Sequence, residues 1–346
     1  MSDISVIVEG KEFKAWTKVE LTRNFDSIDT MAISYPFDSE NKAILNLFKP
    51  FSYNMCQVLY KGSLVFVGTL LDTVPAINAQ SKTETANFYA LPGALIDCSA
   101  NSDRNTLEFT NKSFKSIASE LCAPFGIQIK YTQSAQTRSE VILDKIAIGM
   151  SEPVFSFLSK IAHTQNLYLS SSADGGLLVR QANPTTTALE LTEDLPPLLS
   201  INCQYNPRQY FSEITAVTTG TEATSINGRS TVNNKKINSF RPFVFQSVDS
   251  DVGGIEKAAK SKIARMFTNS VTYSVSIVGW DDRAGNILST NKKVILKAPS
   301  VRVNSPYAFN IRSVKMTAEP NSINSVLELV LLESFTDKIP TKFPWD

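Results

Sequence analysis

The stretch "SFKSIASELCAPFGI", Ser113 to Ile127, marks the point where the sequence changes from strand-like to helical patterns. Thr110 or Asn111 is expected to cap the start of this helix. Pro124 prevents the helix from continuing, and Gly126 can adopt a left-handed turn. The apolar residues recur at intervals of three and four, which places them on one helix face; they are Phe114, Ile117, Ala118, Leu121 and Cys122.

A second helix and a hairpin follow in the next fifty residues. Ser151 is expected to cap this helix, with Pro153 in its first turn, where the missing N–H costs nothing. The hairpin is expected to turn at Asp174-Gly175-Gly176. With the strand-like run after Gly126, these elements predict a central α+β domain over residues 99–200.

On both sides of this domain the sequence is typical of β-structure. Residues 1–98 contain several short alternating runs, among them a hairpin from Cys56 to Val74 that turns at Lys61-Gly62-Ser63. Residues 201–333 return to the same alternation, most clearly from Val271 to Ile277. Closely spaced strands of this kind predict a small barrel or sandwich in each region. We therefore predict a mainly β protein with an α+β centre.

Two segments are expected to interrupt the second β region. Residues 220–240 are rich in Ser, Thr and Asn, so we expect a long surface loop. Residues 254–267 form an amphipathic helix pattern with a basic face; its cations are Lys257, Lys260, Lys262 and Arg265. Such a face is usually solvated, and the alternative is a contact with a partner or a phosphate. Residues 334–346 are left as a C-terminal tail.

Composition gives few hints of a ligand. Lys and Arg total 34 in the 346 residues and Asp and Glu total 33, so no global charge favours specific nucleic-acid binding or anionic membranes. The apolar runs are too short to span a bilayer and no export signal is visible, so we expect a soluble protein made in a cytoplasm, without stable membrane insertion. The four cysteines are expected to be buried free thiols without metal-site spacing; they are Cys56, Cys98, Cys122 and Cys203.

Few residues of the sequence are candidates for a catalytic site. His163 is the single histidine, and we expect it at a helix end rather than paired with Cys122, whose burial would make it inert. Asp281 and Asp282 could be paired carboxylates of a glycosidase, but adjacent strand residues point to opposite faces and "DDRAGN" is typical of a turn. We predict no enzyme activity, cofactor or metal site, with a cell-wall hydrolase as the alternative from another class.

Three segments carry a resemblance to a known family. They are "LIDCSANSDRNTLEFTNKSFKSIASELCAPFGIQI" (residues 95–129), "FRPFVF" (residues 240–245) with the following helix and the ending Gly279-Trp280, and "GNILSTNKKVIL" (residues 285–296). The chain resembles the Mu-like phage baseplate hub proteins of the late-control-protein-D group, which includes the N-terminal part of type VI secretion spike proteins. It departs from the family pattern at Ser289 and Thr290, where an aromatic residue and a proline are usual.

The resemblance implies a structural baseplate hub in the virion tail, assembled in the host cytoplasm. Members form trimeric rings whose subunits carry two tail-tube-like β-barrels, so the ring adapts a sixfold tail tube to a threefold cell-puncturing spike. The implied domains are residues 1–98, 99–200 and 201–333 with the tail 334–346. The implied partners are a homotrimer, the tail spike, a tail tube or distal tail protein and the tape measure protein.

Two questions stay open at this point. Phe343 and Trp345 are candidate anchors for the spike, and a tail folded back on its own domain is the equal alternative. The same hub could serve a secretion system, a tailocin or another phage-derived injection particle.

Overall fold

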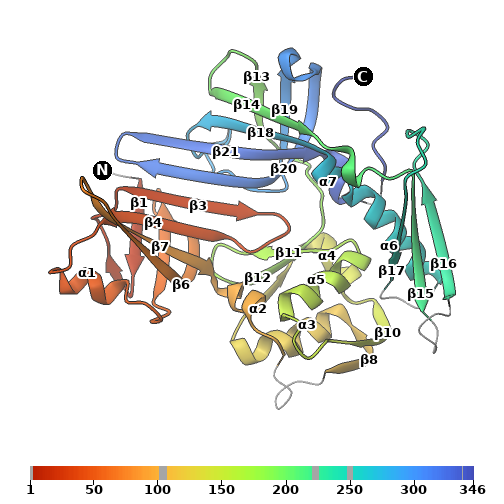
Figure 1. Ribbon diagram of the computed structural model, residues 1–346, viewed down its shortest axis with the longest axis horizontal. Helices are drawn as coiled ribbons and strands as arrows, with labels where there is room; N and C mark the ends of the chain where they lie inside the picture. Colours follow the sequence, from red (N-terminus) through yellow and green to blue (C-terminus); the bar gives the residue numbers. More distant parts are fainter. Residues whose placement is uncertain (1–2, 101–106, 220–225, 248–251, 337) are drawn as a thin grey trace.

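The computed structural model describes residues 3–100, 107–219, 226–247, 252–336 and 338–346. The chain is mostly β, as predicted, and its largest unit is a 13-stranded sheet that runs across the molecule (Figure 1). The paired strands follow the order β14 (Leu198–Tyr205), β18 (Val271–Val278), β21 (Ser322–Leu331), β20 (Val303–Glu319), β3 (Lys18–Asn24), β4 (Thr30–Pro36), β7 (Lys82–Ala90), β6 (Ser63–Ile77), β5 (Met55–Tyr60), β1 (Ile4–Val8) and β2 (Lys11–Glu12). β19 (Lys293–Ala298) pairs with β20 and with β13 (Thr187–Thr192).

One seam joins the N-terminal and C-terminal β regions. β3 and β20 pair antiparallel, with Leu21 opposite Met316 and Val19 opposite Ala318, and all four side chains are buried. The two closed barrels that we predicted are not seen, because among the described residues the pairing runs as one open path. The physical reason is that each region satisfies the exposed backbone groups of the other's edge strand.

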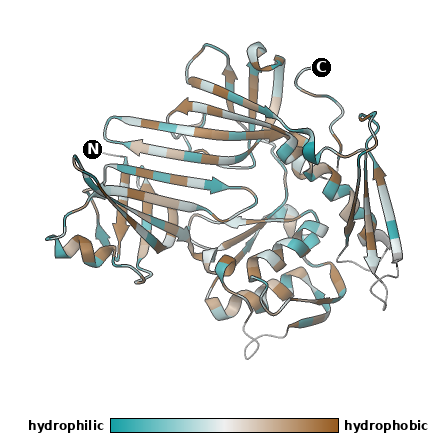
Figure 2. Cartoon of the chain, viewed as in Figure 1, coloured by the Kyte–Doolittle hydropathy of each residue, from teal (hydrophilic) through white to brown (hydrophobic). Residues whose placement is uncertain are grey.

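Side chains from both regions reinforce the seam. The Trp280 ring is fully buried, and its centroid lies 5.3 Å from that of Tyr60. The Trp280 indole N–H donates to the carbonyl oxygens of Thr317 and Asn324, at 3.2 and 3.1 Å. Figure 2 shows apolar and polar residues alternating along these strands, the pattern from which the strands were predicted.

The central domain contains the predicted helices with different starts. Ser113, rather than Thr110 or Asn111, caps α3 (Phe114–Cys122), and its hydroxyl accepts from the Ser116 N–H at 3.2 Å. The two predicted caps lie in β8 (Glu108–Ser113), which pairs with β10 (Ile142–Ala147). The helix therefore begins only at Phe114, after the last residue of β8 that pairs with β10.

The second helix, α5 (Val154–Thr164), begins after Pro153, so the prediction of Ser151 as its cap is wrong. The Val154 N–H donates instead to the Cys98 carbonyl at 3.0 Å, which anchors the helix start to the chain beside α2 (Ala94–Asp97). The predicted hairpin is confirmed: β11 (Tyr168–Ser171) and β12 (Leu177–Arg180) pair antiparallel, and β12 also pairs with β9 (Ile129–Tyr131). The smaller helices are α1 (Lys42–Leu47) in the first region and α4 (Gln133–Ser139) in the central domain.

The predicted surface loop is wrong in part. Residues 226–233 form β16 (Ile226–Asn233), which pairs with β15 (Glu213–Thr219), and β15 also pairs with β17 (Pro242–Gln246). Residues 220–225 of the predicted loop lie outside the described residues. α6 (Val252–Arg265) packs against this small sheet and α7 (Phe267–Ser270) follows, so the predicted helix begins two residues earlier and breaks near Met266.

The cysteine prediction holds for two of the four thiols. Cys56 and Cys122 are buried, Cys203 is half-buried and Cys98 is exposed; all four are free. Cys98 follows the short helix α2 and lies in extended backbone at the surface, where its side chain has no apolar face to join.

Candidate functional site

The C-terminal tail lies against the second β region and carries both predicted anchor residues. Phe343 and Trp345 stack with ring centroids 4.8 Å apart and planes 7° from parallel. The Trp345 ring also meets the edge of Tyr205 at 5.3 Å, and Phe343 lies 6.1 Å from Phe267 of α7. The tail is therefore packed on its own chain, the alternative that the sequence left open.

Polar contacts hold the tail along its length. The Lys236 ammonium donates to the Thr341 carbonyl at 2.6 Å and lies 4.5 Å from the Phe343 ring centroid. The Tyr307 hydroxyl donates to the Lys342 carbonyl at 3.0 Å. At the end of the chain, the Asp346 carboxylate accepts from the Phe343 N–H at 2.8 Å, which closes a local turn.

A groove of about 480 Å³ lies beside this aromatic cluster and is lined by residues of β14, η3 (Pro207–Gln209), α7 and the tail. Trp345 remains 37% exposed there, which leaves part of its ring available to a partner. The sequence named Phe343 and Trp345 but missed Tyr205, Lys236 and Tyr307. No sequence signal could have found them, because each is more than thirty residues from the tail segment that it contacts.

Cys122 and His163 have separate structural environments. Burial raises the pKa of the Cys122 thiol to about 12, so it carries almost no thiolate at neutral pH. His163 lies in the last turn of α5, as predicted. Burial first, then the nearby charges of Arg265 and Lys262, hold its pKa well below the usual value, so its imidazole is neutral.

Asp281 and Asp282 do not form a catalytic pair. The Asp281 carboxylate accepts from the Tyr60 hydroxyl at 3.0 Å and pairs with Lys61 at 2.7 Å, across the seam. The Asp282 carboxylate pairs with Lys292 at 2.7 Å and caps the turn by accepting from two backbone N–H groups. Burial alone would raise the pKa of Asp282, but these partners outweigh it and lower the pKa. Both carboxylates therefore have structural roles.

Two other features are absent from the part of the chain that the structure describes. There, no three His, Cys, Asp or Glu side chains gather closely enough to hold a metal ion. No helix in these same residues is both long and apolar enough to cross a bilayer.

Sequence comparison finds similarity to phage baseplate hub proteins. Residues 92–181 match the family model for the second domain of gp44-like baseplate hub proteins. Baseplate hub protein gp44 of Escherichia phage Mu is 24% identical over 311 residues, which cover 85% of this chain and 79% of that protein. This chain is similar in sequence to phage baseplate hub proteins. The predicted resemblance to Mu-like hubs is thus confirmed.

Similarity in fold to solved structures extends over nearly the whole chain. The 43 kDa tail protein of prophage MuSo2 from Shewanella oneidensis superposes with a TM-score of 0.79 at 20% identity, over 96% of this chain and 98% of that one. The E. coli c3393 protein, a component of the type VI secretion system, superposes with a TM-score of 0.53 at 9% identity, over 94% of this chain and 74% of that one. At these identities the likeness concerns the fold alone.

Proposed function

We propose that three copies of this chain form a ring in the baseplate of a contractile phage tail. The ring would join the sixfold tail tube to the threefold cell-puncturing spike. The observation that carries the proposal is the β3–β20 seam in a hub-like chain, because it fixes two β regions side by side in each subunit. Three subunits would then present six β-rich modules to a sixfold tube.

The division of the chain follows from this role. Residues 1–98 and 201–333 would form the two tube-like modules, residues 99–200 the α+β domain between them, and residues 334–346 the tail. Strongly exposed aromatic side chains are available for contacts in an assembly, where aromatic residues are enriched. Phe51 is 89% exposed and Phe240 is 80% exposed.

The tail would dock the spike through Phe343 and Trp345. Trp345 is held in place by Tyr205 yet keeps an exposed edge, which suits an anchor that meets its partner preorganised. The further partners in this proposal are the tail tube or distal tail protein and the tape measure protein. The role is structural, with no catalysis, cofactor, specific nucleic-acid binding or stable membrane insertion. The chain would reside in the virion tail after assembly in the host cytoplasm.

A reconstruction of the particle tip at side-chain resolution tests the ring directly. We expect three copies around the axis, with the spike in contact with the tail residues. Six copies around the axis would contradict the threefold ring. Light scattering on the isolated chain, alone and with the purified spike, would show whether the trimer needs its partner.

A secretion-system or tailocin hub is the second candidate, and the type VI component with the same fold supports it. The two machines would use the same ring and differ in what surrounds it. The neighbouring genes distinguish them: a capsid and packaging set indicates a phage, whereas their absence beside sheath and tube genes indicates an injection particle.

A further inference from the structure

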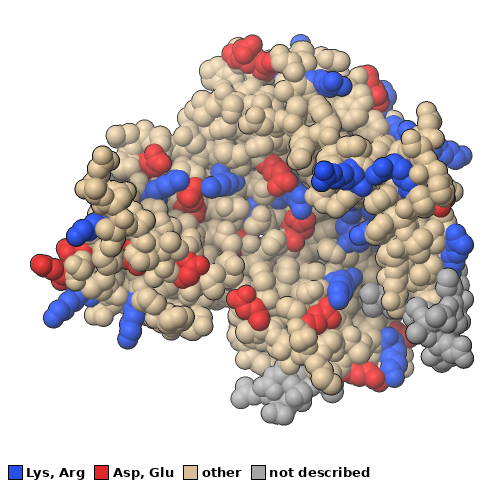
Figure 3. Space-filling model, viewed as in Figure 1, with Lys and Arg blue, Asp and Glu red and all other residues tan. Residues whose placement is uncertain are grey.

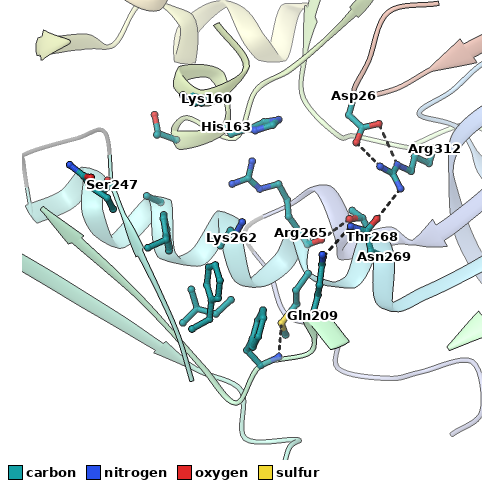
Figure 4. Close-up of a pocket in the computed structure, with 18 residues that line it drawn as sticks. Asp26, Lys160, His163, Gln209, Ser247, Lys262, Arg265, Thr268, Asn269 and Arg312 are labelled. Atoms are coloured by element: carbon teal, nitrogen blue, oxygen red, sulfur yellow. Dashed lines mark hydrogen bonds and ion pairs between the residues drawn. The ribbon is translucent and has the colours of Figure 1, made fainter. Parts of the chain in front are cut away.

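A cleft of about 600 Å³ lies between the central domain and the small β15–β16–β17 sheet (Figure 4). α5 contributes Lys160 and His163 to its wall, and α6 contributes Lys262 and Arg265. The Ser261 hydroxyl donates to the His163 carbonyl at 3.0 Å, which fixes α6 against α5. The cleft is therefore framed by two helices tied to each other.

Most charged groups of the cleft have a partner. Arg312 binds both carboxylate oxygens of Asp26, at 3.3 and 3.1 Å, and also pairs with Glu328 at 3.1 Å. The Lys160 ammonium lies 2.5 Å from a carboxylate oxygen of Glu152. These pairs close one end and one side of the cleft.

Lys262 and Arg265 differ from these groups. One helical turn apart on α6, they face the cleft (Figure 4). Neither forms a close ion pair with a carboxylate among the described residues, and Asp26 attracts Arg265 only from a longer distance. The Nε of Arg265 is shielded from solvent without a hydrogen-bond acceptor. Burial, together with repulsion between the two cations, lowers the pKa of Lys262. An anion beside the Lys262 ammonium and the Arg265 guanidinium would relieve this repulsion.

The floor of the cleft is apolar and aromatic. Phe211 and Phe243 stack at 4.8 Å, and Phe245 continues the row at 6.3 Å from Phe243. The Lys262 ammonium lies 5.3 and 5.9 Å from the Phe243 and Phe245 ring centroids. A free inorganic anion would make no apolar contact with this floor. A peptide that carries a carboxylate next to an apolar side chain would contact both the cations and the phenylalanine rings.

We propose that this cleft binds an acidic segment of another polypeptide, with a carboxylate between Lys262 and Arg265 and an apolar or aromatic side chain on the phenylalanine floor. Charge favours a peptide over nucleic acid. Lys160 and Arg312 are already paired with carboxylates, and acidic and basic side chains are interspersed on the visible surface (Figure 3), so the cleft suits a single carboxylate better than the run of phosphates in a nucleic acid. The proposal does not depend on the ring or on spike docking at the tail.

The test uses the purified full chain and a fluorescent random copolymer of Glu and Tyr as the probe, followed by anisotropy. We expect saturable binding that the unlabelled copolymer displaces better than poly-Glu does. Arg265→Gln should weaken binding about tenfold, the loss expected for one charge-assisted hydrogen bond. Lys262→Gln should weaken it in the same direction and serves if the first variant fails to fold by circular dichroism.

Lys257→Gln is the matched control, because Lys257 is an exposed cation of the same helix outside the cleft. Equal weakening by Lys257→Gln would indicate non-specific attraction and overturn the proposal. So would the absence of copolymer binding, displacement by inorganic phosphate alone, or equally strong binding of a single-stranded thymidine oligonucleotide.

Discussion

The turn between β3 and β4 and the C-terminal tail use the same chemistry at different depths. In the turn, Phe25 contacts Tyr168 and Phe335, with centroids 5.1 and 4.6 Å away, and the Arg180 guanidinium lies 4.5 Å above its ring. In the tail, Phe343 stacks on Trp345 under the Lys236 ammonium, also at 4.5 Å. Each is an aromatic cluster with one cation over its central phenylalanine.

The two clusters differ in how deeply they are buried. Phe25 is fully buried, and Arg180 donates to the Asn24 and Phe25 carbonyls at 2.6 and 3.3 Å, so the turn joins the N-terminal region to the central domain. The tail cluster lies at the surface, and its cation binds a carbonyl that solvent also reaches. The buried cluster around Phe25 therefore holds two regions of the chain together in the folded state. The surface cluster around Phe343 can open locally, which releases the tail at a small cost in free energy.

Removing the central ring of the buried cluster should have the largest effect. We expect Phe25→Ala to lower the free energy of unfolding by about 3–5 kcal/mol, because the cavity would lie under a buried guanidinium. Urea denaturation followed by circular dichroism measures the loss. Phe343→Ala is the matched control, and it should cost no more than about 1.5 kcal/mol at its partly exposed site. Equal losses from the two variants would show that depth does not separate the clusters.

Asp29, at the end of the same turn, should give the buried joint a distinctive pH dependence. Burial raises the pKa of its carboxyl to about 6, although the Asn24 N–H and the charges of Arg23 and Arg180 oppose the rise. The folded state therefore holds the proton more tightly than the unfolded state, so this contribution is full below pH 4 and is lost as the pH rises through about 6. The loss is on the order of 3 kcal/mol.

Asp29→Asn removes this titration. The unfolding free energy of the variant should therefore rise relative to the wild type by up to about 3 kcal/mol between pH 4 and pH 7, as measured by denaturation at several pH values. Asp174→Asn provides the surface contrast. The ion pair with Lys130 and the Ser172 hydroxyl lower the pKa of Asp174 to about 2, so its contribution is present at neutral pH and lost in acid. The same sign for both variants would refute the assignment.

Local elements of this fold could be predicted from sequence, whereas their joints could not. The alternation in residues 271–277 and the turn glycine Gly62, at φ +77°, act within a few residues, and both elements form as expected. The β3–β20 seam pairs residues almost three hundred positions apart, and neither strand has a sequence feature that predicts which strand it pairs with. The predicted cap of α3 was wrong for a related reason. Thr110 and Asn111 lie in β8, which pairs with the distant strand β10.

The candidate sites divide in the same way. Phe343 and Trp345 could be named because the family resemblance directs the tail toward a spike and exposed aromatic residues often carry contact energy. The residues that hold them come from distant elements and could not be named. The basic face of the helix at 254–267 could also be recognised. The structure distinguishes its exposed lysines from Lys262 and Arg265, which face the cleft; that difference arises from the position of α5, which the helix pattern does not contain.

The smallest expected effect on stability belongs to the exposed ring of the tail. Trp345→Ala should lower the global free energy of unfolding by no more than about 1 kcal/mol, since it removes one stacked and one edge contact at a half-solvated site. Tail release should respond more strongly, so trypsin should cleave after Lys342 several-fold faster while the denaturation midpoint barely moves. Tyr205→Phe is the control, because it keeps the ring against Trp345 and removes only the hydroxyl, which bonds the Val301 carbonyl and the Tyr273 hydroxyl rather than the tail. Cleavage as slow in Trp345→Ala as in Tyr205→Phe would mean that the indole does not hold the tail, and the difference in depth between the two clusters would then have no consequence for release.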